Sequence, residues 1–67
     1  MIDVTINGEG DQLADDVTVA ALVAERARSP RGTAVAVNGE VVPRSTWKVT
    51  PLHPGDRIEL LRASQGG

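Results

Sequence analysis

The sequence predicts an α+β fold, in which one main helix packs across a mixed sheet of four to five strands. Three observations support this: stretches in which apolar and polar residues alternate, Asn-Gly pairs at which such stretches turn back, and one segment with helical spacing. The chain has 67 residues, 40% hydrophobic and 24% charged, which is an ordinary composition for one globular domain. The chain should therefore fold, with a small core.

The first hairpin begins at the N-terminus. Apolar and polar residues alternate over residues 2–6, which is typical of a strand with one buried face. Asn7-Gly8 then supplies a tight turn, because both residues tolerate positive φ. We expect the return strand at Asp11–Ala14, with Leu13 directed inward.

A helix follows the hairpin. Apolar residues fall at positions i, i+3, i+4 and i+8 of one helical face, at Val19, Leu22, Val23 and Ala27. Thr18 is a suitable N-cap, and Arg26 and Arg28 suit the negative end of the helix dipole. The Ser-Pro-Arg-Gly run at residues 29–32 should end the helix after about ten residues.

A second hairpin is expected after the helix. Thr33–Val37 is rich in small and β-branched residues, Asn38-Gly39 is a strong turn signal, and Glu40–Val42 is the partner strand. Pro43 ends that strand because it lacks a backbone donor. We expect the stretch from there to Thr50 to be irregular.

The last regular element is a strand at residues 57–62. Ile58 and Leu60 should face the core, whereas Glu59 and Leu61 should face outward. Strand, strand, helix, hairpin and final strand is the element order of a β-grasp fold. Residues 1–62 are thus predicted to form one β-grasp domain.

A tail follows the domain. Residues 63–67 have no periodicity and end in two glycines, so we expect a flexible C-terminal tail made of Ala63, Ser64, Gln65, Gly66 and Gly67. Glycine is common in such tails, so Gly66 and Gly67 could be present without any specific function. A backbone without side chains can also thread a narrow groove, which a Cβ atom would block.

The composition excludes several classes of function. The chain has no cysteine, so it has no disulfide, thiolate metal site or nucleophilic thiol. A net charge of −2 gives no positive electrostatic field that would attract the phosphates of a nucleic acid. The N-terminus lacks the pattern of a signal peptide, and the apolar run Val19–Ala24 is far shorter than the roughly 20 residues that span a bilayer. We expect a cytoplasmic protein with no membrane partner.

The carboxylate of Gly67 is the strongest candidate for chemistry. An α-carboxyl has a pKa of about 3.5, so it is ionised at neutral pH and can attack phosphorus as an oxygen nucleophile. The chain has no glycine-rich phosphate loop and no metal-ligand cluster in its sequence, and we expect no permanently bound cofactor. ATP and Mg²⁺ should come from a partner, which would make this protein a substrate and not an enzyme.

Other residues are candidates for weaker roles. His53 is the single histidine and has no catalytic partner at a suitable spacing, so we interpret it as a surface residue. Trp47 is either a partly buried core residue or a binding hot spot. Arg44 is expected in solvent, where it could orient a carboxylate of a partner. The candidate partner-binding residues are Arg44, Trp47 and Leu61, the last as an exposed apolar contact.

Five motifs follow one another along the whole chain: Asn7-Gly8-Glu9, Thr18-Val19-Ala20, Ala34–Arg44, Gly55-Asp56-Arg57 and Gly66-Gly67. In this order they resemble the sulfur-carrier proteins of thiamine biosynthesis, a bacterial ubiquitin-like family. The stretch around Trp47 matches no motif. The resemblance implies that a ubiquitin-activating-like enzyme adenylates the Gly67 carboxylate with ATP.

The same resemblance implies the later steps and their partners. A persulfide donor, such as a cysteine desulfurase, converts the adenylate to a thiocarboxylate, which donates its sulfur to thiazole synthase for the thiazole ring of thiamine. Residues 63–66 would enter the partner's active site.

Three alternatives stay open at this stage. The small subunit of molybdopterin synthase has the same fold and Gly-Gly end, but it tends to be longer and richer in aromatic residues, whereas this chain has no Phe. A ubiquitin-like protein modifier would use the same adenylate. An interaction module would carry the glycines incidentally.

Overall fold

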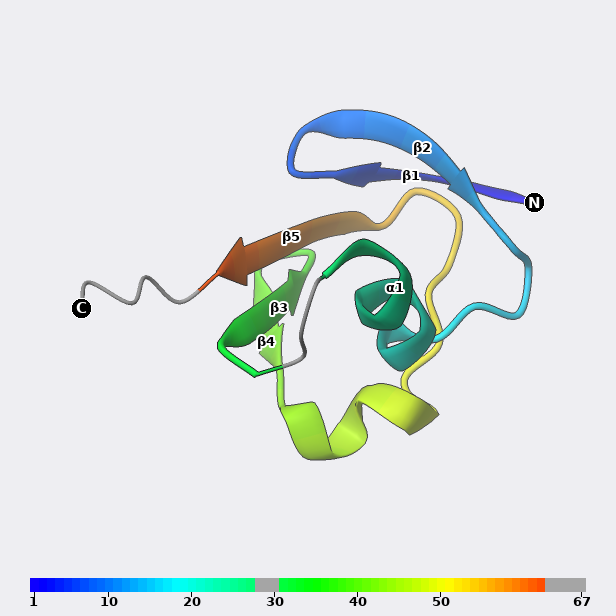
Figure 1. Cartoon of the computed structure of the whole chain (residues 1–67). Helices are drawn as coiled ribbons and strands as arrows, with labels where there is room; N and C mark the ends of the chain where they lie inside the picture. The colour runs from blue at the N-terminus through cyan, green and yellow to red at the C-terminus, as the bar shows by residue number, and fades with distance from the viewer. Residues whose placement is uncertain (28–30, 63–67) are drawn as a thin grey trace.

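A computed structural model describes residues 1–27 and 31–62. It contains one five-stranded sheet, with helix α1 across one face (Figure 1). The elements in chain order are β1 (Ile2–Ile6), β2 (Glu9–Leu13), α1 (Val19–Arg26), β3 (Thr33–Val37), β4 (Glu40–Val42), the 3-10 helix η1 (Arg44–Val49) and β5 (Arg57–Arg62). The predicted β-grasp fold is confirmed, whereas the expected tail at residues 63–67 lies outside the described residues.

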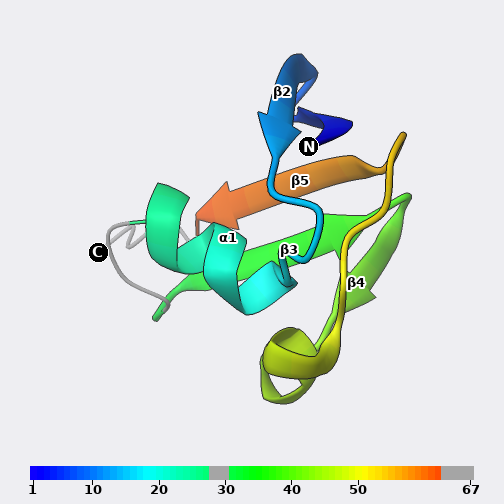
Figure 2. The same ribbon diagram turned by 90° about the vertical axis from the view of Figure 1, so that its right-hand side faces the viewer.

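The first and last strands lie side by side in the middle of the sheet, whose strand order is β2-β1-β5-β3-β4. β1 pairs with β5 in parallel, and the other neighbouring pairs are antiparallel. Parallel neighbours need a crossover connection, and α1 supplies part of it. Figure 2 shows β5 passing between the hairpin of β1 and β2 and the hairpin of β3 and β4.

The helix starts where the sequence predicts. The hydroxyl oxygen of Thr18 accepts a hydrogen bond from the backbone N–H of Ala21 at 3.2 Å, so Thr18 is the N-cap. The helix has eight residues, fewer than the expected ten, because the backbone of Ala27 is already extended. The Ala27 N–H still donates to the carbonyl oxygen of Val23 at 2.8 Å. Arg26 lies in the last turn, as expected, and Arg28 lies outside the described residues.

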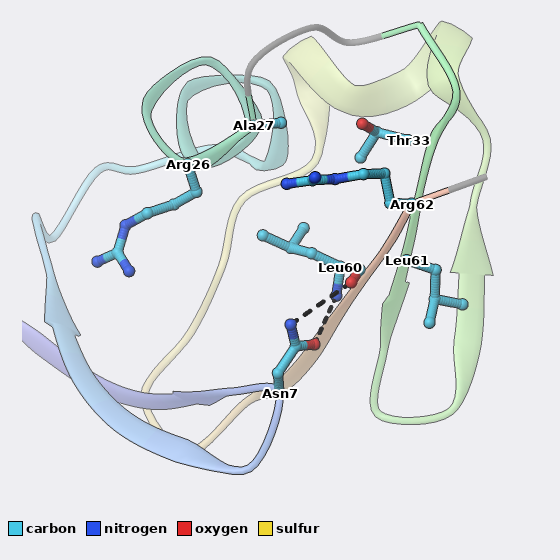
Figure 3. A pocket seen from close by; sticks show the side chains of 7 residues that line it. All are labelled: Asn7, Arg26, Ala27, Thr33, Leu60, Leu61 and Arg62. Atoms are coloured by element: carbon cyan, nitrogen blue, oxygen red, sulfur yellow. Dashed lines mark hydrogen bonds between the residues drawn. The ribbon is translucent and has the colours of Figure 1, made fainter. Parts of the chain in front are cut away.

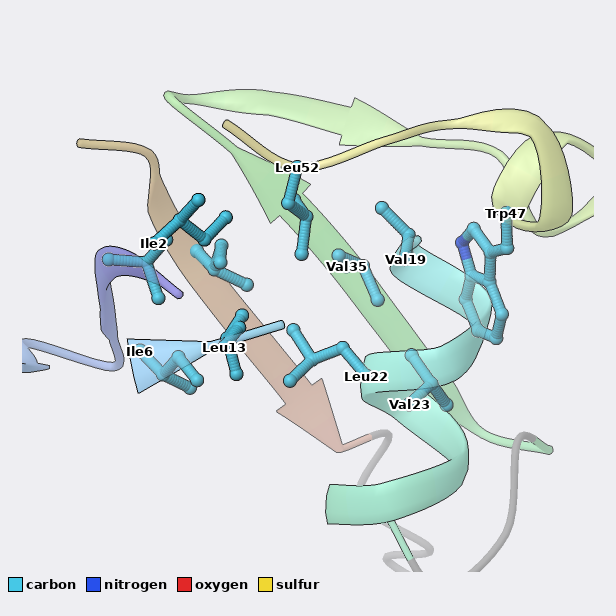
Figure 4. Packing of buried hydrophobic residues seen from close by; sticks show 11 residues of the cluster. Ile2, Ile6, Leu13, Val19, Leu22, Val23, Val35, Trp47 and Leu52 are labelled. Carbon is cyan, nitrogen blue, oxygen red and sulfur yellow. The ribbon is translucent and has the colours of Figure 1, made fainter. Parts of the chain in front are cut away.

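The core lies between α1 and the sheet (Figure 4). It is built almost entirely from aliphatic side chains, contributed by Ile2, Val4, Ile6, Leu13, Val19, Leu22, Val23, Val35, Trp47, Leu52 and Ile58. Leu22 and Ile58 are each 1% exposed, so the helix and the central strand meet at the centre of the core. The inward orientation of Ile58 and Leu13 is confirmed.

The stretch after β4 corrects one expectation, because it forms η1 and is not irregular. The carbonyl oxygen of Pro43 accepts hydrogen bonds from the N–H and the hydroxyl of Thr46, both at 2.9 Å. The indole N–H of Trp47 donates to the carbonyl oxygen of Val42 at 2.9 Å. A six-residue 3-10 helix with a single buried side chain produces no apolar periodicity, which explains why the sequence did not predict it. Trp47 is only 5% exposed, a fuller burial than expected.

The second strand also differs from its prediction, since β2 begins at Glu9 and ends at Leu13. The two-residue turn at Asn7-Gly8 pairs Ile6 directly with Glu9, so the ladder begins immediately after the turn. The polar residues of this edge strand gave no apolar alternation to mark its start. No helix in residues 1–27 and 31–62 has the length and apolar character needed to cross a bilayer.

We predict that Leu22→Ala lowers the free energy of unfolding by about 2–5 kcal/mol, because it leaves a cavity between α1 and the sheet. Such a loss is large for a domain of this size. Urea denaturation measures it, with Val41→Ala as the control, because Val41 is 73% exposed. The control should stay within about 0.5 kcal/mol of the wild type. Equal effects of both substitutions would contradict the position of Leu22 in the core.

Candidate functional site

β5 carries the chain towards Gly67, and its two sides are paired to different extents. On the β3 side the pairing covers the whole length of β5 from Ile58, and Thr33 lies opposite Arg62. On the β1 side backbone pairing covers only Thr5 with Arg57 and Ile6 with Ile58. The predicted tail residues Ala63, Ser64, Gln65, Gly66 and Gly67 lie outside the described residues, so the structure describes this site up to Arg62.

Leu61 lies on the sheet face opposite α1, as predicted, and its side chain is 54% exposed. Residues directly opposite each other on neighbouring strands share a face. Leu61 pairs with Ala34, and Ala36 pairs with Val41, so these four residues form a continuous outer apolar strip. Ala36 is 6% exposed although it does not belong to the core cluster, which indicates that its neighbours in the strip cover it.

Arg44 and Trp47 lie on the other side of the molecule. They line a shallow groove of about 290 Å³ between η1 and α1, together with Ala20, Val23, Ala24 and Lys48. Because α1 covers the inner face of the sheet, this groove and the outer apolar strip face different directions. The three residues that the sequence analysis grouped as partner-binding therefore do not form one surface.

A small cavity of about 130 Å³ adjoins the end of β5 (Figure 3). Its lining consists of Asn7, Arg26, Ala27, Thr33, Leu60, Leu61 and Arg62. In Figure 3 the side chain of Arg62 extends towards the end of α1, whereas the Asn7 amide is directed at the backbone of Leu60. Asn7 Oδ1 accepts a hydrogen bond from the Leu60 N–H at 2.9 Å, and Asn7 Nδ2 donates to the Leu60 carbonyl oxygen at 3.5 Å.

A second asparagine holds the start of β5 in a similar way. Asn38 Oδ1 accepts from the Arg57 N–H at 2.9 Å, and Asn38 Nδ2 donates to Asp56 Oδ1 at 3.0 Å. Asp56 is only 9% exposed, and its other carboxylate oxygen accepts from the His53 N–H at 2.8 Å. The His53 side chain itself is 70% exposed, as expected of a surface histidine.

The roles of these two asparagines were missed in the sequence. Asn7 and Asn38 have φ values of 52° and 53°, so both adopt the left-handed conformation that the Asn-Gly turns require. The pattern therefore predicted the turns correctly. The partner of Asn7 is 53 residues away, and no local pattern reports a contact over that separation.

An ion pair joins β2 to the end of α1. The guanidinium of Arg26 donates a hydrogen bond to the carboxylate of Asp11, which also accepts from the Gln12 N–H. The bond from Arg26, followed by that from Gln12, holds the pKa of Asp11 below its usual value, and the bond to Asp11 raises the pKa of Arg26. No local sequence pattern predicts this pair, because its two residues lie on separate elements, 15 residues apart.

Comparison with protein families identifies a match over almost the whole chain. Residues 4–67 match the sequence model of the ThiS family. The chain is 30% identical over 66 residues to the sulfur carrier protein ThiS of Escherichia coli strain K12, an alignment that covers 98% of this chain and 100% of that protein. It is also 36% identical over 62 residues to a thiazole synthase of Paramagnetospirillum magneticum. That alignment covers 92% of this chain but only 19% of the length of the thiazole synthase.

Solved structures agree with the sequence comparison. The crystal structure of the thiamine biosynthesis protein ThiS from Geobacter metallireducens has a TM-score of 0.84 at 29% identity, and the alignment covers 98% of this chain and 100% of that one. The NMR structure of a thiamine biosynthesis protein from the same organism has a TM-score of 0.81 at 28% identity, with 98% and 88% coverage.

We predict that the ion pair makes a small contribution to stability that depends on pH. Because folding lowers the pKa of Asp11, its contribution is complete above the unfolded value of about 3.9 and is lost as the pH falls through the lower folded value. Asp11→Asn should therefore lower the urea midpoint slightly at pH 7, and this difference from wild type should shrink below about pH 4.

The matched control is Glu40→Gln, which removes an exposed carboxylate that forms no ion pair with the described residues. Its urea midpoint should follow that of the wild type at both pH values. If Asp11→Asn differed from wild type equally at pH 7 and pH 3, the difference would not come from ionisation of Asp11.

Proposed function

The chain belongs to the ThiS family, and on this basis we propose that it is a sulfur carrier in thiamine biosynthesis whose working group is the Gly67 carboxylate. The observation that carries the proposal is the family match, which extends to residue 67 and so includes Gly66 and Gly67. The likeness to the Escherichia coli carrier over 100% of that protein's length supports it further. The alternatives of a molybdopterin synthase subunit, a protein modifier and an interaction module have no comparable support.

In the proposed first step, a carboxylate oxygen of Gly67 attacks the α-phosphorus of ATP, and pyrophosphate leaves. The resulting acyl adenylate makes the carboxyl carbon electrophilic. The terminal sulfur of a persulfide then attacks this carbon and AMP leaves, after which a second thiol cleaves the sulfur–sulfur bond and frees the thiocarboxylate. This chain has no cysteine, so it can hold transferred sulfur covalently only at a group that a partner activates, and in this proposal that group is the Gly67 carboxylate.

A partner enzyme must supply the catalytic groups for these steps. The sequence contains no glycine-rich phosphate loop, and in residues 1–27 and 31–62 no three potential metal ligands lie together. In this proposal ATP and Mg²⁺ belong to a ubiquitin-activating-like enzyme, and a cysteine desulfurase or a similar protein provides the persulfide. Because the first step consumes ATP, we propose that the cycle runs in the cytoplasm.

The proposed acceptor of the sulfur is thiazole synthase. The similarity of this chain to part of a thiazole synthase supports this choice, because a related segment and a thiazole synthase occur there in one polypeptide. Residues 63–66 would lead Gly67 into the active site of each partner. Two glycines at the end suit a narrow entrance, because neither carries a Cβ atom.

The outer apolar strip is the proposed docking surface for the adenylating enzyme. Leu61 is the next-to-last residue of β5, so in this proposal a partner that receives the tail would lie close to this strip. The strip exposes Val41 and Leu61 and is flanked by the charged side chain of Glu59. An apolar patch with a polar rim is typical of a protein interface.

We predict that incubation with a ThiS-type adenylating enzyme, ATP, Mg²⁺ and a persulfide donor increases the intact mass by the difference between one sulfur and one oxygen. Deletion of Gly67 should abolish the shift, because the carboxylate would end roughly 3.5 Å short of the reacting phosphorus. Gly67→Ala keeps the carboxylate but adds a Cβ atom, so it should slow the reaction and not abolish it. An unchanged mass of the folded wild-type chain would overturn the proposal.

We predict that Leu61→Asp raises the KM for adenylation by roughly tenfold, because it places a charge in the outer apolar strip. Val49→Asp is the matched control, because Val49 is 77% exposed but lies in η1, away from the strip. Pyrophosphate release at varied carrier concentration measures both. The same KM for both variants would exclude the strip as the docking surface.

A further inference from the structure

We propose that Asn7 is a positioning residue for the reaction at Gly67, because its side chain holds the end of β5 from which the tail leaves the domain. This inference rests on the proposed function and deepens it. The residue lies in the turn between β1 and β2, and it contacts β5 only through the chain's tertiary structure. It does not touch the reacting atoms.

The parallel pairing of β1 with β5 stops before β5 ends. The last backbone bond on this side runs from the Asn7 N–H to the carbonyl oxygen of Ile58 at 2.9 Å. At Asn7 the backbone turns away into the hairpin, with φ 52°. The N–H and carbonyl of Leu60 therefore have no strand beside them on the β1 side.

The side chain of Asn7 takes the place of the missing strand. A carboxamide has a donor and an acceptor arranged much as in a peptide group. Asn7 Oδ1 accepts a hydrogen bond from the Leu60 N–H at 2.9 Å, and Asn7 Nδ2 donates one to the Leu60 carbonyl oxygen at 3.5 Å. The side chain thus extends the ladder by one more pairing, from Ile58 to Leu60.

The residue at position 7 must both adopt a positive φ and form hydrogen bonds to Leu60. The positive φ favours Gly, Asn or Asp, because other side chains are strained in the left-handed region. Of these three, only Asn offers both a donor and an acceptor at the end of a short side chain. The turn alone would accept glycine, so the asparagine is explained by its contact with Leu60.

No close packing replaces this contact at the end of β5. The cavity of about 130 Å³ lies beside Leu60, between Asn7, the end of α1 and Arg62. Without the Asn7 side chain, Leu60–Arg62 would keep their pairing with β3 and the packing of Leu60 against the core, but would lose the hydrogen bonds on the β1 side. The side-chain contact therefore limits the motion of these three residues on the side where the sheet is open.

The consequence for the reaction concerns how the tail is presented. Five residues follow Arg62 up to Gly67. If Leu60–Arg62 loosened, the segment between the last fixed residue and the carboxylate would grow to about eight residues, and the effective concentration of its end would fall roughly twofold by the −3/2 power of length. The direction in which the tail leaves would also vary. Both effects weaken productive binding to the partner and leave the chemical step unchanged.

Asn38 provides a matched control within the same chain. It occupies the same kind of turn, with φ 53°, and its side chain also bonds to β5. Its partners are Arg57 and Asp56 at the start of the strand, far along the chain from the tail. Asn38→Gly and Asn7→Gly remove equivalent side chains while both turns keep a residue that accepts positive φ.

The first test is amide hydrogen exchange of the free chain, followed by NMR, and it needs no partner. Asn7→Gly should speed exchange at the Leu60 N–H by roughly tenfold, because this N–H loses its acceptor. Asn38→Gly should speed exchange at Arg57 instead. Asn7→Asp keeps the acceptor oxygen and tolerates positive φ, so Leu60 should stay close to wild type. Unchanged exchange of Leu60 in Asn7→Gly would overturn the proposal.

The second test separates positioning from stability. With the adenylating enzyme, ATP and Mg²⁺, Asn7→Gly should raise KM by roughly two- to tenfold at unchanged kcat, and Asn7→Asp should restore KM. Asn38→Gly should keep KM within about twofold of wild type, even if urea denaturation shows equal destabilisation of the two glycine variants.

The outcomes distinguish the two proposals. Equal KM values for Asn7→Gly and Asn38→Gly, in an active wild-type background, would overturn the positioning role and leave the carrier function intact. A wild-type chain that is never adenylated would overturn the carrier function, and the positioning role with it.

Discussion

The parallel pairing of the first and last strands is the constraint on which the rest of this structure depends. β5 lies in the middle of the sheet, between β1 and β3, and so it contacts both hairpins. This arrangement requires a crossover, which brings α1 onto one face and buries Leu22 against the sheet. It also leaves the opposite face open, where the outer apolar strip runs from the end of β5 across β3 to β4. The position of β5 thus determines the core and the exposed surface together.

In a core this small, each side chain contributes a large share of the buried apolar area, so the position of each side chain matters for stability. The one aromatic residue, Trp47, fills the space beside α1 and donates its indole N–H to Val42. The buried carboxylate of Asp56 accepts hydrogen bonds from Asn38 and from the backbone of His53. No buried side-chain polar atom in residues 1–27 and 31–62 is without a partner. Polar groups in the turns therefore support the fold, and they gather around the strand that leads to Gly67.

This organisation fits a protein that is acted on by others. The cavity beside the end of β5 and the groove between η1 and α1 are small, and the chemistry of the proposed function requires only a carboxylate at the end of a chain. The domain must then provide recognition and a defined starting point for the tail. In the proposed function the outer apolar strip would serve recognition, and the bonds of Asn7 to Leu60 would fix the starting point of the tail, whereas Asn38 holds the opposite end of β5.

The sequence by itself determined the features that local chemistry controls. Alternation over β1, helical spacing after Thr18 and the two Asn-Gly turns predicted the order of elements, the N-cap and the β-grasp fold. The outward direction of Leu61 also followed from strand alternation. Each of these depends on a few neighbouring residues, so it can be read along the chain.

The tertiary structure decided what depends on distant partners. The helical turn η1, the full burial of Trp47 and the pair of Asp11 with Arg26 required contacts between separate elements. The separation of Arg44 and Trp47 from Leu61 became visible only when α1 was placed on one face of the sheet. The bonds of Asn7 to Leu60 join residues at opposite ends of the chain. Folding alone brings them together, because the sheet places the last strand beside the first.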